Sequence, residues 1–214
     1  MNATLERTLQ LTQLSGKAVN DLSSSFHDLP KTKHADGQYR LRRYSIVKVR
    51  DTGIVHLAAR EFVQSDDINT FQGNVSRSFE VIEDAVINSQ GMFEMCRVFR
   101  DANHLSAEHE IEIHQMRIAT SEDETQVAPE GVHQDGFQHI AVIGIDRHNI
   151  EGGDFLVYRE KNAQPFLSMA LQQGEVAILA DNQLWHNARP IKAVKKDHQG
   201  YMDVFVLTAK GAVV

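Results

Sequence analysis

Gly131-Val132-His133-Gln134-Asp135-Gly136-Phe137-Gln138-His139-Ile140 joins a His-x-Asp pair to the start of a mostly apolar segment. In an extended chain, side chains two residues apart point to the same side, so His133 and Asp135 can share one ion. A third ligand must come from elsewhere, and His186 follows several strand-like segments later. Neutral imidazoles and a carboxylate suit Fe(II) and leave coordination positions for other ligands. We therefore predict one divalent metal held by His133, Asp135 and His186.

Other interpretations of these residues stay open at this level. Sites with two histidines and a carboxylate also hold zinc in hydrolases, although the commonest zinc hydrolase motif, His-Glu-x-x-His, is absent. The absence of His-x-His weakens an assignment to the metal-binding cupins. A second His-x-Asp triplet, His34-Ala35-Asp36, follows Pro30 in a turn-rich segment, and we predict that it forms a loop.

The composition is that of an ordinary soluble globular protein. The chain has 214 residues, 42% hydrophobic and 24% charged, which suits one domain over residues 1–214. Its formal net charge of −7 argues against a nucleic-acid partner. No run approaches the length of a membrane span and the start lacks an apolar signal core, so we expect no membrane partner and a cytoplasmic location. Oligomeric state leaves no pattern in the sequence.

The single cysteine, Cys96, excludes a disulfide framework and a cysteine-rich zinc site. Within Met92–Phe99 the apolar residues fall on one helical face, and Cys96 is among them. Free cysteine packs as a small hydrophobic residue, so we predict that Cys96 lies in the core.

The pattern of apolar residues predicts a mainly β fold with flanking helices (α+β). Residues 4–22 have mostly helical spacing, and about 1–38 is expected to be helical or irregular. Helices are also expected across roughly 77–100. Strands are predicted at 39–49, 54–59, 111–118, 137–145, 154–158, 167–171, 175–179 and 201–208. Short strands with intervening turns favour a sandwich or barrel over about 39–214, with helices packed on its outside.

Five sequence motifs are, in combination, specific enough to indicate a protein family. They are Pro129-Glu130-Gly131-Val132-His133-Gln134-Asp135-Gly136, Glu151-Gly152-Gly153-Asp154 and Trp185-His186-Asn187-Ala188-Arg189-Pro190, with Leu41-Arg42-Arg43-Tyr44-Ser45 and Ile113-His114-Gln115-Met116-Arg117 upstream. In combination the chain resembles the bacterial Fe(II)/2-oxoglutarate-dependent dioxygenases that hydroxylate free L-amino acids, with the isoleucine dioxygenase family nearest. The resemblance covers roughly residues 39–208.

The resemblance implies a double-stranded β-helix, the jelly-roll that cupins also have, with helices on one side. It implies that His133, Asp135 and His186 are iron ligands. It also implies that 2-oxoglutarate binds the iron through its keto-acid end and is decarboxylated to succinate. Dioxygen then supplies the oxygen atom for hydroxylation of an unactivated C–H bond.

One departure from the family concerns the cosubstrate. The family usually carries Tyr-Arg-Asp near the start of the last strand, and its arginine pairs with the distal carboxylate of 2-oxoglutarate. Here the motif is Tyr201-Met202-Asp203, and a thioether cannot neutralise a carboxylate. We predict that Arg189, where the family tends to have threonine, binds 2-oxoglutarate instead, with Arg117 as a second candidate. Because Gln115 and Arg117 share one strand face, we expect them to grip the carboxylate of the substrate or the cosubstrate.

These inferences lead to a dioxygenase that hydroxylates a small free amino acid, aliphatic or a relative. Two alternatives belong to other classes. Met202 favours a catalytically silent jelly-roll protein that binds a metabolite in regulation or stress response, and the ligand set alone also fits a non-iron metal hydrolase. No motif specifies which amino acid, or which carbon, is oxidised.

Overall fold

The computed structural model of the protein describes residues 8–58, 60–62, 74–120 and 124–211. Its helices are α1 (Gly16–Ser23), the 3-10 helix η1 (Ser24–Phe26), α2 (Asp84–Ile87) and α3 (Gln90–Ala102). Its strands are β1 (Leu9–Gln13), β2 (Arg40–Arg50), β3 (Gly53–His56), β4 (Glu110–Thr120), β5 (His139–His148), β6 (Ile150–Gly152), β7 (Phe155–Tyr158), β8 (Leu167–Met169), β9 (Glu175–Ala180), β10 (Trp185–Ala188), β11 (Ile191–Ala193) and β12 (Gly200–Ala209).

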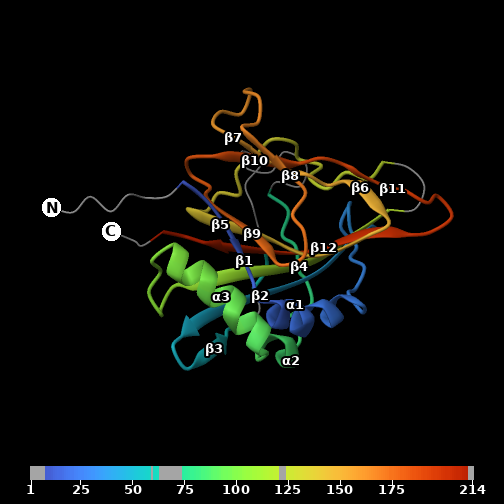
Figure 1. The fold of residues 1–214 in the computed structure, drawn as a ribbon. Coiled ribbons are helices and arrows are strands. Elements are labelled where there is room, and N and C mark those ends of the chain that lie inside the picture. Colours follow the sequence, from blue (N-terminus) through green and yellow to red (C-terminus); the bar gives the residue numbers. More distant parts are fainter. Residues whose placement is uncertain (1–7, 59, 63–73, 121–123, 212–214) are drawn as a thin grey trace.

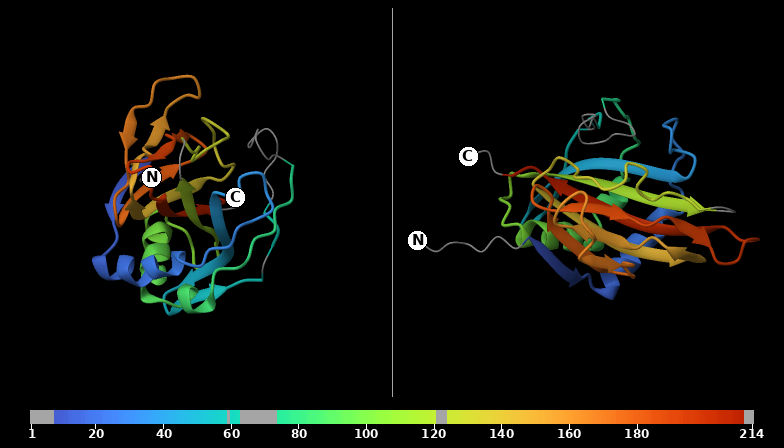
Figure 2. Two further views of the ribbon diagram at one scale, coloured as in Figure 1. Left: turned by 90° about the vertical axis from the view of Figure 1, so that its right-hand side faces the viewer. Right: turned by 90° about the horizontal axis from the view of Figure 1, so that it is seen from above.

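The strands form one large and two small antiparallel sheets. The large sheet has seven strands in the order β1-β9-β5-β12-β4-β2-β3, and the small sheets are β10-β7-β8 and β11-β6. Figure 1 shows the helices gathered on one face of the large sheet and β7, β8 and β10 on the other. Figure 2 shows the same layers from two further sides. This mostly β arrangement with few helices is consistent with the expected jelly-roll.

Strand β12 lies at the centre of the large sheet, between the core and the pocket, and its side chains point alternately to one and to the other. Phe205 and Leu207 point toward the helices and belong to the main hydrophobic core, where the ring of Phe205 meets that of Phe26 edge-on at 5.0 Å. Met202 and Val204 point the opposite way, toward the small sheets. Because successive side chains of a strand lie on opposite faces, one strand stabilises the core and lines the pocket.

Serine caps and a glycine determine how the helices pack. The Ser15 hydroxyl accepts the backbone N–H of Ala18 at the start of α1, and the Ser89 hydroxyl accepts that of Met92 at the start of α3. A Cβ at Gly91 would lie 2.5 Å from the carbonyl oxygen of Ala18. Only glycine therefore allows α3 to approach α1 this closely.

The structure corrects two of the predicted helical stretches. Residues 9–13, expected to be helical, form β1, which pairs with β9 from Leu9↔Leu179 to Gln13↔Glu175. Leucine alternates with polar residues in this segment, and such a pattern fits an edge strand that can pair with β9. The helix begins only after Ser15. Residues 77–83, also expected to be helical, run extended, and Glu80 bridges to Arg43 of β2. In the described residues no helix is long and apolar enough to cross a membrane.

Cys96 occupies the predicted core position on α3 and is fully buried. Burial raises the pKa of its thiol to about 12. At pH 8 the thiolate fraction of the folded protein is therefore about 1 in 10,000. We predict no measurable reaction with a thiol-specific disulfide reagent at pH 8 in the native protein and full reaction of one thiol in denaturant. Rapid labelling of the native protein would contradict a core position.

Candidate metal centre

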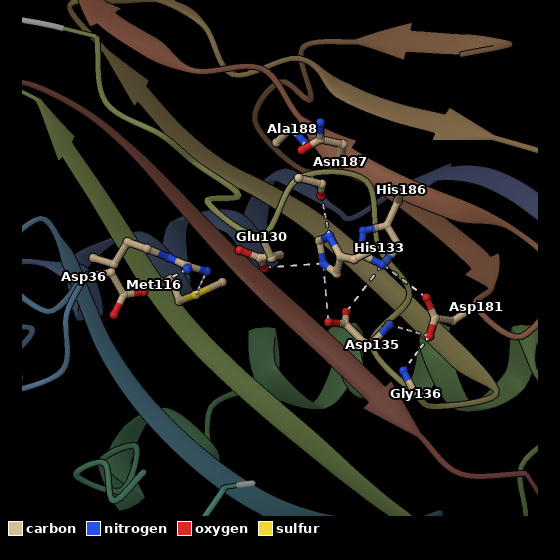
Figure 3. A network of polar contacts seen from close by, with 12 residues as sticks. Asp36, Met116, Glu130, His133, Asp135, Gly136, Asp181, His186, Asn187 and Ala188 are labelled. Carbon is tan, nitrogen blue, oxygen red and sulfur yellow. Dashed lines mark hydrogen bonds and ion pairs between the residues drawn. The ribbon is translucent and has the colours of Figure 1, made fainter. Parts of the chain in front are cut away.

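The structure brings the three predicted ligands together (Figure 3). Each of His133, Asp135 and His186 offers one ligand atom, and these atoms lie within 4.8 Å of one another. A pair of backbone hydrogen bonds holds the two histidine segments side by side: His133 N–H donates to His186 O, and His186 N–H to His133 O, both at 2.9 Å. The loop before β5 and strand β10 thus meet despite their separation in sequence.

The side chains of the His-x-Asp loop are oriented by local hydrogen bonds. Nδ1 of His133 lies 2.8 Å from the carbonyl oxygen of Gly131, so this nitrogen donates a proton and Nε2 remains available as a ligand. Gln134 points away and donates to the carbonyl oxygen of Leu184 at 3.2 Å. The Asp135 carboxylate lies between the histidines, 3.6 Å from His133 Nε2 and 3.5 Å from His186 Nε2.

A fourth side chain, Asp181, holds both ligand segments. It lies between β9 and β10 and is fully buried. Its Oδ2 accepts the backbone N–H groups of Asp135, Gly136 and Phe137 at 2.7, 3.1 and 3.4 Å, and its Oδ1 lies 3.1 Å from Nε2 of His186. In the sequence the Asp181-Asn182 pair is typical of a turn, and that pattern does not mark Asp181 as part of the metal site. An acidic residue between a buried strand and the distal histidine is the signal that was missed.

The electrostatics of the site favour a bound cation. Burial alone would raise the pKa of Asp135, but the hydrogen bond from His133 and the charges of both histidines hold it well below its usual value. Burial would lower the pKa of His133, but Asp135 and Glu130 raise it to about 9. The carboxylates thus stabilise positive charge among the imidazoles, and a divalent ion held by His133, Asp135 and His186 would supply that charge in place of the proton. The donor set fits Fe(II).

A pocket beside the metal ligands lies between the large sheet and the small sheets. Its walls are mostly apolar and come from β4, β5, β7 and β12. Three arginines also line it, Arg40, Arg42 and Arg77, of which Arg40 forms an ion pair with Asp36 at 2.8 Å. The Arg42 side chain is buried beside the Phe79 ring, 5.1 Å from its centroid. Among the described residues it has no carboxylate within ion-pair distance, and burial lowers its pKa to about 9.

The structure places Gln115 and Arg117, which were predicted to grip a carboxylate, away from the pocket. Both lie on the helix-facing side of β4, whereas His114, Met116 and Ile118 face the pocket. Gln115 donates to the backbone oxygen and the hydroxyl of Ser25, at 3.1 and 2.6 Å. Arg117 forms a bidentate ion pair with Asp203, both contacts at 2.7 Å. Periodicity shows which residues share a face but not which face meets the pocket.

Arg189, the other predicted cosubstrate residue, is also outside the pocket. Its side chain is exposed, and its backbone N–H donates to the carbonyl oxygen of Asp154 at 2.9 Å. The arginines that do line the pocket come from β2 and from the segment that pairs with Phe62. Arg42 and Arg43 belong to one of the motifs that carried the family resemblance, but periodicity did not mark Arg42 as a pocket residue.

We predict that Asp181→Asn weakens Fe(II) binding by about 10- to 100-fold, because loss of the carboxylate charge loosens both ligand segments. Anaerobic titration with Fe(II) measures this effect, and circular dichroism checks the fold. Asn182→Ala, at the exposed neighbouring position, is the matched control and should bind iron as the wild type does. Unchanged iron affinity in Asp181→Asn would refute the positioning role.

Comparison with solved structures reveals close similarity in fold. A bsmA homolog from Methylobium petroleophilum aligns with a TM-score of 0.77 and 25% identity, over 92% of this chain and 82% of that chain. IDO from Bacillus thuringiensis aligns with a TM-score of 0.75 and 14% identity, over 94% of each chain. A protein of the 2OG-Fe(II) oxygenase family from Burkholderia pseudomallei aligns with a TM-score of 0.56 and 14% identity, over 95% and 84%. A search of curated proteins finds no match.

The sequence itself matches a family model described as 2OG-Fe dioxygenase across residues 23–208. That match includes all three metal ligands and every residue that lines the pocket. Members of this family use Fe(II), 2-oxoglutarate and dioxygen, and the ligands here are assembled as such chemistry requires. The chain therefore belongs to the 2OG-Fe dioxygenase family.

Proposed function

We propose that this dioxygenase hydroxylates a free, small L-amino acid with an aliphatic side chain or a related one. In the same reaction 2-oxoglutarate is decarboxylated to succinate. The observation that carries the proposal is the charge arrangement of the pocket: a buried arginine that has no carboxylate partner among the described residues and a carboxylate beside the metal ligands both face a mostly apolar space.

Arg42 suits the carboxylate of an amino acid. A buried guanidinium without a counter-ion is costly, and an anionic ligand that accepts its hydrogen bonds removes much of that cost. The planar donors of arginine match the two oxygens of a carboxylate. Arg77 adds positive charge nearby. Its charge helps to lower the pKa of Arg42, although burial and the charge of Arg40 have larger effects.

Glu130 suits the ammonium group of the same molecule. Its side chain is 11% exposed, and its Oε1 lies 3.4 Å from Nε2 of the metal ligand His133. It lines the pocket together with Arg42. A ligand that carries both charges can interact with both residues, whereas an uncharged ligand leaves the buried charge of Arg42 uncompensated.

The remaining walls suit an aliphatic side chain. Ile140, Val142, Phe155 and Leu171 line the pocket, and Val204 and Val206 of β12 face the same space. His114 also lines it; burial, aided by the charge of Arg42, lowers the pKa of its imidazole well below the usual value, so the ring is neutral. An apolar, water-poor wall positions a C–H bond and excludes competing reactions.

When bound, Fe(II) and 2-oxoglutarate supply the oxidising chemistry, and the protein supplies position and surroundings. His133, Asp135 and His186 would hold the metal on one side. Asp181 keeps the two ligand segments in register. Arg42 and Glu130 would hold the two charged ends of the amino acid, so that its side chain lies among the apolar residues.

The proposal is tested by screening the twenty amino acids for succinate formation from 2-oxoglutarate under air. We expect turnover with one or a few aliphatic amino acids, and anaerobic Fe(II) plus 2-oxoglutarate should give a visible charge-transfer band. A silent binding protein would give the band without succinate from any amino acid. A metal hydrolase would give no band.

We predict that Arg42→Met raises KM for the amino acid by about 30-fold or more, because the substrate carboxylate loses its partner. Steady-state succinate formation measures this change. Glu130→Gln should raise the same KM through loss of the ammonium partner. Arg50→Met, an exposed arginine on the same strand, is the control and should leave KM unchanged. Normal KM in both pocket variants would argue against an amino-acid substrate.

A further inference from the structure

A second arginine, Arg147, lies beside Met202, the position at which the family usually carries an arginine. Met202 on β12 pairs directly with Arg147 on β5. Directly opposed residues of an antiparallel pair point to the same face of the sheet, so Arg147 shares the pocket side with Met202. A β-bulge between Asp203 and Val204 shifts the pairing along these strands and makes this alignment possible.

Gly153 shows how close the two side chains come to the pocket. A Cβ built on Gly153 would lie 3.1 Å from Sδ of Met202 and 3.2 Å from Nη1 of Arg147. Both side-chain ends therefore converge on one point, and Gly153 and Met202 line the pocket. Gly153 has a φ of +70°, and its lack of a side chain leaves room here for the Arg147 guanidinium, the Met202 thioether and the Ile191 side chain.

The Arg147 guanidinium is only partly satisfied. Its Nη2 donates to the carbonyl oxygen of Gly152 at 2.5 Å. Its Nη1 is buried without a hydrogen-bond partner, and among the described residues no carboxylate lies within ion-pair distance of it. Burial is the main cause that lowers its pKa, opposed by the charge of Asp154. A buried N–H donor without a partner is uncommon in folded proteins and needs an explanation, of which a bound anionic ligand is one.

We propose that Arg147 binds the distal carboxylate of 2-oxoglutarate, in place of the arginine that the family carries at the position of Met202. The cation comes from the neighbouring strand β5, and its Nη1 lies directly behind Met202 and Gly153, which line the pocket. Met202 is unbranched and flexible, so its thioether can move aside and pack along the methylene groups of the cosubstrate. Arg42 remains available for the substrate.

This proposal rests on the cosubstrate of the family and not on the identity of the amino acid. Binding of 2-oxoglutarate to the anaerobic Fe(II) protein, measured without any amino acid, therefore tests it separately from the proposed substrate. The comparison ligand is 2-oxopentanoate, which has the same chain length and keto-acid end but no distal carboxylate. The preference for 2-oxoglutarate over 2-oxopentanoate measures the contribution of the distal carboxylate.

In Arg147→Met we expect the affinity for 2-oxoglutarate to fall by about 30-fold or more, while that for 2-oxopentanoate changes little. Arg189→Met removes an exposed arginine and is the matched control, with no change in either affinity. Restoring the family arrangement in the double variant Arg147→Met/Met202→Arg should recover most of the preference for 2-oxoglutarate. General damage to the fold or the iron site would weaken both ligands alike.

A second pair of variants leaves Arg147 in place, in case its removal disturbs folding. Met202→Glu places a carboxylate beside Arg147, where it should compete with the cosubstrate and abolish the preference. Met202→Gln has nearly the same shape without the charge and should retain it. Preserved preference in Met202→Glu, or loss of preference in Arg42→Met with Arg147→Met unaffected, would overturn the assignment.

Discussion

The site depends on one carboxylate that joins two parts of the chain. Asp181 accepts three consecutive backbone N–H groups of the loop that begins at Asp135 and also contacts the ring of His186. Without it, the loop before β5 would be tied to β10 mainly by the two backbone hydrogen bonds between His133 and His186. Three metal ligands from two segments need this fixed geometry, because an open coordination site tolerates little movement of its ligands.

The second constraint is the alternation along the central strands. On β4 and β12 one set of residues packs under the helices and the other set lines the pocket. The buried ion pair of Arg117 and Asp203 lies on the helix side, where the Arg117 guanidinium also stacks 3.9 Å from the centre of the Tyr201 ring. The pocket side carries Met202 in the same strand. A shift of one residue in register would exchange these two environments.

The sequence predicted the mainly β architecture, most of the strands and the convergence of the three metal ligands, because each leaves a local pattern or a recognisable motif. It did not predict β1, since Leu9–Gln13 forms a strand only beside β9. It did not place Arg117, because a strand pattern does not identify the face that meets a ligand. Asp181 and Arg147 went unnoticed because each is marked out only by a contact with a distant part of the chain, Asp181 with Asp135 and Arg147 with Met202.

The position of β1 has a consequence for the handling of this protein. β1 covers the outer edge of β9, and β9 leads directly into Asp181. An uncovered strand edge offers its backbone groups to other molecules and promotes self-association. Deletion of β1 would leave the backbone groups along this edge of β9 unpaired, so a shortened chain that begins at α1 would hold the segment that leads into Asp181 less firmly and would retain iron less well.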